Sequence, residues 1–106
     1  MDATELILNF INVSKANPKI KPLHVSLYLA LFQFWLRADC KNPIRISRRT
    51  VMNTAKVNSI ATYHKGMQEL CLSKYISYFP SYDPRIKSEV YLFDLKKEAV
   101  PEGTAP

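Results

Sequence analysis

In the first part of the chain, apolar positions recur every three or four residues, the spacing of a helix with one buried face. The pattern predicts an amphipathic helix that Thr4 caps and that Asn17-Pro18 interrupts. A second helix is expected from Pro22 to about Ala38, because proline suits the first turn of a helix. This second segment is apolar nearly all round, so we expect it to lie at the centre of the domain or against a partner chain.

The middle of the chain predicts a short strand followed by two short helices. Residues 43–46 alternate briefly between apolar and polar, as a strand does. Ser47 is placed to cap a helix over about residues 48–56, and Ser59 to cap another that continues to about residue 72 or 73. The two helices are therefore expected to meet across a tight turn.

The helix that begins near Ser59 is expected to have an apolar inner face and a small or polar outer face. At about 100° per residue, five side chains fall on the inner face: Ile60, Tyr63, Met67, Leu70 and Cys71. The outer face carries Ala61, Thr62, Lys65, Gln68 and Glu69. Because glycine costs a helix interior about 1 kcal/mol, Gly66 predicts that another backbone packs closely there.

The last third of the chain predicts a β-hairpin with a long tip. Strands are expected over residues 75–79 and 89–95, which are rich in aromatic and β-branched residues. We expect their aromatic side chains to pack across the strands and against the second helix. The alternative is a platform on which single-stranded bases stack. The aromatic side chains concerned are Tyr75, Tyr78, Phe79, Tyr91 and Phe93.

The order of these elements carries a family resemblance. A capped helix begins in residues 46–52, and a second helix starts with serine in residues 59–65 and closes with Leu70. A hydrophobic pair, Tyr75-Ile76, then opens the hairpin. Over about residues 44 to 95 the chain closely resembles the winged helix-turn-helix family. The resemblance implies an α+β fold. The length of 106 residues predicts one domain, over residues 1–96, and the polar residues with proline and glycine that follow predict a disordered tail over residues 97–106.

Two further features bear on this resemblance. Lys74 stands where the family usually has glycine in a left-handed conformation, so we expect modest strain there. The second half of the chain, including Tyr82-Asp83-Pro84, is also similar to phage replication organisers and to small DNA-binding proteins of bacterial mobile elements. The resemblance implies duplex DNA binding by a transcriptional regulator or an architectural accessory factor.

The distribution of charge favours the same kind of partner. The formal net charge is +6, and residues 41–87 hold nine basic side chains against two acidic ones. A one-sided basic segment attracts a polyanion, and nucleic acid is the commonest such partner of a small basic domain. The alternative is a basic surface that only keeps the protein dissolved.

Side chains on the helix near Ser59 are candidates for reading the DNA sequence. Lys65 and Gln68 are expected to reach base edges or phosphates, and Thr62 a base or a thymine methyl group. Ser59 is expected to hold a phosphate beside the helix N-terminus. For each residue alone, the alternative is a solvated surface side chain. His64 lies at the edge of the apolar face and is expected to be a boundary residue.

Basic residues around this helix are candidates for binding the DNA backbone. Arg45, Arg48 and Arg49, at or just before the start of the helix over about residues 48–56, are expected to contact phosphates. Arg85 and Lys87, at the tip of the hairpin, are expected to contact phosphates or to enter the minor groove. If about five phosphates are neutralised, log K should fall with log[salt] at a slope of about −4.5.

The sequence offers little support for a metal-binding protein, an enzyme or a secreted protein. Cys40 and Cys71 are expected to be free thiols, and with His24 and His64 they lack the close spacing of a zinc site, so no metal or cofactor is expected. No phosphate-binding glycine loop, nucleophile elbow or triad predicts an enzyme. The start of the chain lacks the basic residues of a secretion signal. We therefore expect a cytoplasmic protein without a membrane partner.

Protein partners are the remaining alternative. The first two helices are expected to complete the core and to pair two copies in a homodimer, which predicts inverted-repeat DNA sites. Instead of binding DNA, the winged helix can serve as a protein-protein interaction module in a replication or transcription complex, with apolar residues of the second helix at the contact.

Overall fold

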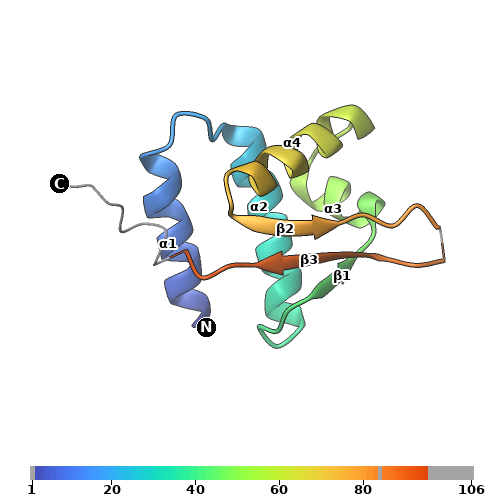
Figure 1. The fold of residues 1–106 in the computed structure, drawn as a ribbon, viewed down its shortest axis with the longest axis horizontal. Helices are drawn as coiled ribbons and strands as arrows, with labels where there is room; N and C mark the ends of the chain where they lie inside the picture. Colours follow the sequence, from blue (N-terminus) through green and yellow to red (C-terminus); the bar gives the residue numbers. More distant parts are fainter. Residues whose placement is uncertain (1, 84, 96–106) are drawn as a thin grey trace.

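Helices cover one face of a small sheet in the part of the chain that the computed structural model describes, residues 2–83 and 85–95 (Figure 1). In chain order the elements are α1 (Ala3–Lys15), α2 (Pro22–Arg37), β1 (Ile44–Ile46), α3 (Arg48–Ala55), α4 (Ile60–Leu72), β2 (Ile76–Phe79) and β3 (Ser88–Leu92). Four helices and a three-stranded antiparallel sheet in these residues confirm the α+β class. The predicted tail over residues 97–106 lies outside the described residues.

The sheet has the strand order β1-β3-β2, with every pair antiparallel. Val90 in the central strand is paired with Ile44 on one side and with Tyr78 on the other. Ile44, Val90 and Leu92 are buried, because alternate residues of each strand face the helices. The β2–β3 hairpin extends beyond the helices at its tip (Figure 1). Residues of this hairpin between positions 78 and 88, which belong to the predicted wing, line a hollow together with Arg48 at the start of α3 and His64 of α4.

The core is built around α2, as its apolar sequence predicts. Leu27, Tyr28, Leu31 and Trp35 of this helix have no exposed surface. Phe10 of α1 stacks on Tyr28, with ring centroids 3.8 Å apart and an interplanar angle of 4°. Because α2 contacts both α3 and α4, it fixes the position of these helices relative to the sheet.

Serine caps define the starts of α3 and α4 as predicted, whereas the cap of α1 differs. The Ser47 and Ser59 hydroxyls accept hydrogen bonds from the backbone N–H of Thr50 and Thr62, each at 3.2 Å. The prediction that Thr4 caps α1 is wrong. Asp2 caps this helix by accepting from the Thr4 N–H at 3.3 Å. A carboxylate suits this position because it also interacts favourably with the positive end of the helix dipole.

Both hairpin strands are shorter than predicted. β2 starts at Ile76 because the Tyr75 N–H donates to the carbonyl of Leu70, at 3.0 Å, and so closes the end of α4. β3 ends at Leu92, where the Asn42 side chain accepts from its backbone N–H at 3.0 Å and donates to its carbonyl at 2.8 Å. The Asn42 side chain thus takes the Leu92 N–H and carbonyl, which a further residue of a neighbouring strand would otherwise pair with.

Two residues with special backbone requirements lie in or beside α4. Lys74 has a φ of 68°, so the predicted left-handed conformation is confirmed. At Gly66, the predicted close approach of another backbone is wrong. An added Cβ would overlap with the side chain of Leu27 and stand 3.1 Å from that of Leu23. Glycine is therefore needed because leucine side chains of α2 fill the space beside it.

The aromatic residues of the hairpin pack mainly on helices other than α2. Tyr75 meets Phe10 of α1 edge to face at 5.7 Å, and Tyr78 meets Tyr63 of α4 at 6.3 Å. Phe79 packs across the strands against Tyr91 at 5.9 Å, as predicted. The predicted packing against the second helix is therefore corrected to α1 and α4.

Candidate nucleic-acid interface

One side of α4 is buried and the other is exposed. Tyr63, Met67 and Leu70 have no exposed surface, whereas the predicted DNA-reading side chains Thr62, Lys65 and Gln68 are exposed. Ile60 was placed on the inner face, and this prediction is wrong because 49% of the residue is exposed. It stands at the first helical position, and side chains tilt toward the helix N-terminus, so it extends past the packed part of α4.

Glu69 also departs from its predicted place on the outer face of α4. Its carboxylate oxygen Oε1 lies 2.7 Å from Nε2 of the buried His24, at the start of α2. The other ring nitrogen of His24 accepts from the Lys21 backbone N–H at 2.8 Å. Glu69 is the sole acidic residue of α4, so this pairing leaves the side of the helix that carries Lys65 without a carboxylate.

The basic residues proposed to bind the DNA backbone fall into two groups. Two have acidic partners: Arg45 lies 3.6 Å from Glu89, and Arg85 lies 3.1 Å from Asp83. In residues 2–83 and 85–95, no acidic partner is found for the other three, Arg48, Arg49 and Lys87, nor for Lys65 among the proposed DNA-reading residues. These four side chains are available to an anion without first breaking an ion pair.

Arg85 is held at the hairpin tip by several bonds to one carboxylate. Its Nε and Nη2 donate to the two oxygens of Asp83 at 3.2 and 3.1 Å, and its backbone N–H donates to Oδ1 at 2.9 Å. The bonds from the Arg85 side chain and backbone lower the pKa of Asp83 from its ordinary value. Asp83 is therefore ionised at neutral pH and competes with any phosphate for Arg85.

Cations from three elements meet where α3 begins beside α4 and the hairpin. A hollow of about 410 Å³, which we call the basic hollow, is lined in part by Ser47, Arg48, His64, Tyr82, Lys87 and Ser88. A smaller hollow of about 120 Å³ beside it is lined in part by Arg45, Thr50 and Lys87. The fold thus brings Arg45, Arg48 and Lys87 together. Arg49, Ser59, Thr62 and Lys65 lie on neither lining.

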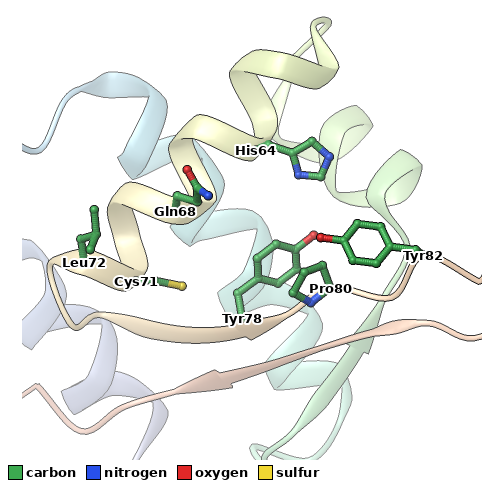
Figure 2. A pocket seen from close by; sticks show the side chains of 7 residues that line it. All are labelled: His64, Gln68, Cys71, Leu72, Tyr78, Pro80 and Tyr82. Carbon is green, nitrogen blue, oxygen red and sulfur yellow. The ribbon is translucent and has the colours of Figure 1, made fainter.

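A second depression, the α4–hairpin groove, runs between α4 and the hairpin and has a volume of about 630 Å³ (Figure 2). Its lining residues are His64, Gln68, Cys71, Leu72, Tyr78, Pro80 and Tyr82. Gln68 is a predicted site residue, and His64 is half-buried as a boundary residue should be. Tyr78 belongs to the alternative stacking platform that the sequence leaves open, whereas Pro80 and Tyr82 were not predicted as site residues. The available signal was Tyr82 itself, an aromatic residue in a polar hairpin tip, of which 89% is exposed.

The walls of the groove hold neutral groups that can donate hydrogen bonds. The Tyr63 hydroxyl donates to the Tyr78 hydroxyl at 3.3 Å, which leaves the Tyr78 hydrogen for another acceptor. Burial, and next the hydrogen bond to Tyr78, raise the pKa of Tyr63, so it remains a donor. Burial also raises the pKa of the Cys71 thiol, so the groove has an uncharged thiol at its wall.

The part of the chain that the structure describes holds neither a candidate metal site nor a candidate membrane-spanning helix. Within residues 2–83 and 85–95, no three His, Cys, Asp or Glu side chains are grouped so that they could hold a metal ion. None of the helices in this part of the chain has the length and hydropathy needed to span a membrane. Comparison with protein-family models, curated proteins and solved structures found no match to this chain.

Proposed function

We propose that this chain is a non-catalytic winged helix-turn-helix protein that binds duplex DNA, with α4 in the major groove and the β2–β3 hairpin as the wing. The observation that supports this most is the exposed side of α4, which is free of carboxylates and flanked by unpaired cations of α3 and the hairpin. The major groove admits an α-helix whose outer side chains reach base edges. A transcriptional regulator or an architectural accessory factor fits this chemistry, and the proposal includes such a factor of a mobile element in a bacterial cytoplasm.

Each predicted site residue has a role in this proposal. Thr62, Lys65 and Gln68 face the bases, because they are exposed on one side of α4. The Ser59 hydroxyl already caps α4, and its hydrogen can still be donated to a phosphate. Arg48, Arg49 and Lys87 bind phosphates directly, whereas Arg45 and Arg85 are held by Glu89 and Asp83 and contribute less to phosphate binding.

The first test is a fluorescence anisotropy titration of random duplex DNA at several salt concentrations. Arg48, Arg49 and Lys87, the phosphate-binding cations without an acidic partner in the described residues, give an expected slope of log K against log[salt] of about −2.7, at about −0.9 per phosphate. This slope is shallower than the sequence alone predicts, because Arg45 and Arg85 are paired in the free protein. Absence of salt-dependent binding would overturn the proposal.

Matched variants make this test specific for the surface. Arg48→Ala should weaken binding to all duplex sequences alike and reduce the slope by about 0.9. Lys65→Ala and Gln68→Ala should instead relax sequence preference. Lys15→Ala on α1 is the control, since it removes the same charge at an exposed position far along the molecule from the hairpin tip (Figure 1). Equal losses for Arg48→Ala and Lys15→Ala would contradict the proposed surface.

Pairing of two copies through α2 is a further part of the proposal, and one observation favours it. Leu29 and Leu36 of α2 are 45% and 43% exposed, although the rest of this helix supplies the centre of the core. They are seven residues apart and therefore lie on the same side of the helix. A second copy of the chain is the partner we infer for this side, which gives a homodimer with two DNA-binding surfaces.

A further inference from the structure

The α4–hairpin groove and the basic hollow adjoin each other, because His64, Tyr78, Pro80 and Tyr82 line both. We refer to the two together as the depression. The end at the basic hollow offers the cations Arg48 and Lys87 and several hydroxyl groups. The opposite end is formed by Cys71 and Leu72 and is apolar. The depression therefore has one end suited to an anion and another suited to a flat apolar group.

An intact duplex uses only part of this depression. Its outer surface presents phosphates, sugars and base edges, which fit the cationic end. The faces of its bases are stacked and so cannot reach Leu72 and Cys71. A nucleotide that has left the stack combines a phosphate with an exposed base face, and aromatic side chains bind such bases by stacking. The volume of about 630 Å³ lies within the range of about 300 to 1,000 Å³ for small-ligand sites.

We propose that the α4–hairpin groove takes one unpaired nucleotide of the DNA strand to which the protein binds. Its phosphate lies beside Arg48 and Lys87, and its base lies against Tyr82 and the apolar end of the groove. This inference rests on the proposed DNA binding and adds to it a preference for duplex ends or junctions over continuous duplex.

The hydrogen-bonding groups around the groove suit the edge of a base. Gln68 comes from α4 and Tyr78 from β2, and both side chains line the same groove (Figure 2). Gln68 can donate and accept, whereas the Tyr78 hydroxyl accepts from Tyr63 and keeps its own hydrogen to donate.

One carboxylate, that of Asp83, lies near the proposed phosphate site, and it is paired. Asp83 lines the basic hollow but is held by Arg85, and Glu69 is bound to His24 outside both linings. Tyr82 is the side chain best placed to stack on an entering base. Its ring points from the hairpin back toward Tyr78 and α4, across the groove (Figure 2), and most of its surface is exposed.

The test compares two DNA ligands with equal numbers of phosphates, a fully paired duplex and a duplex with a short single-stranded extension. A fluorescent adenine analogue in the extension reports stacking through quenching of its emission. We expect the extended duplex to bind about tenfold more tightly, with the analogue quenched, since one stacked base contributes roughly this factor. Free deoxynucleoside monophosphate at high concentration should restore the emission of the analogue, because it competes with the extension for the groove.

Variants separate stacking from general wing contacts. Tyr82→Ala should abolish the preference for the extension and leave binding of paired duplex unchanged, whereas Tyr82→Phe should retain the preference. Phe79→Ala is the matched control, because Phe79 is an exposed aromatic of the same hairpin that packs against Tyr91 and is not in the groove lining. Both positions are exposed, so these variants should fold.

The two proposals fail in different ways. Equal binding of both ligands, or an equal loss for both in Tyr82→Ala, would overturn the nucleotide site while duplex binding stands. Binding of the extension as a free single strand, with no binding of paired duplex, would overturn the proposed function and support the groove. If the apolar end instead takes a peptide of a protein partner, the analogue will not be quenched, which also overturns the nucleotide site.

Discussion

At the scale of single residues, the acidic side chains decide which cations can reach a phosphate. Asp83 accepts three hydrogen bonds from Arg85, and Glu89 lies beside Arg45. The first pairing is local, because Asp83 and Arg85 are two residues apart, whereas Arg45 and Glu89 come together through the pairing of β1 with β3. On an exposed surface such pairs are weak and screened by salt, so a phosphate can compete with the carboxylate for the arginine.

The pair at the hairpin tip gives a prediction. Asp83→Asn should tighten duplex binding about two- to fivefold, because it frees Arg85 and removes a negative charge near the DNA. The slope of log K against log[salt] should steepen by about 0.9, as one more phosphate is neutralised. Glu5→Gln on α1 is the control with the same change in net charge. If both variants tighten binding equally, Arg85 does not gain a phosphate contact.

Cys71 gives a second residue-scale prediction, on pH dependence. Burial raises the pKa of its thiol, so less of the reactive thiolate is present at pH 8 in the folded protein than in the unfolded chain. In a Cys40→Ser background, alkylation of Cys71 by iodoacetamide should be slower in buffer than in urea and should increase at higher pH when folded. Equal rates in buffer and urea would contradict a buried, neutral thiol in the groove wall.

At the scale of elements, the contact between α2 and α4 sets the position of the proposed DNA-reading helix. His24 holds Glu69 at the C-terminal part of α4, and Ser26 donates to the Ala55 carbonyl at the end of α3. Leu23 and Leu27 fill the space beside Gly66. One helix thus anchors both helices of the proposed DNA-binding motif.

Gly66→Ala tests this contact. Alanine favours a helix over glycine by about 1 kcal/mol, but its Cβ overlaps with Leu27, and overpacking of a core costs about 1–3 kcal/mol. Because Leu27 is fully buried, we expect a net loss of about 1 kcal/mol in the free energy of unfolding, measured with urea. The double variant Gly66→Ala, Leu27→Ala should show favourable coupling. A more stable Gly66→Ala single variant would contradict the tight packing of α4 on α2.

At the scale of the whole molecule, the fold places two different surfaces on one helical core. The basic surface lies around the start of α3, α4 and the hairpin, whereas Leu29 and Leu36 are exposed on α2. If α2 pairs two copies, as we infer, the two α4 helices would read half-sites about one turn of DNA apart. The proposed function requires only the basic surface, so it holds for a single copy as well.

Much of the fold follows from the sequence because its signals are local. Ser47 and Ser59 each bond to a backbone N–H three residues ahead, so the starts of α3 and α4 could be read from neighbouring residues. The exposed positions of Thr62, Lys65 and Gln68 followed from helical periodicity. The cap of α1 was missed although its signal was also local, since Asp2 and Thr4 are both good caps.

The tertiary structure decided what depends on residues far apart in the chain. Glu69 pairs with a histidine 45 positions away, and Asn42 ends β3 across 50 positions. The α4–hairpin groove exists because Tyr78 and Tyr82 of the hairpin come to lie beside His64 and Gln68 of α4. Periodicity and capping concern neighbours along the chain, so the sequence determined the helices, their caps and the exposed side of α4. Which charges remain unpaired, and which side chains enclose the groove, depended on how these elements pack together.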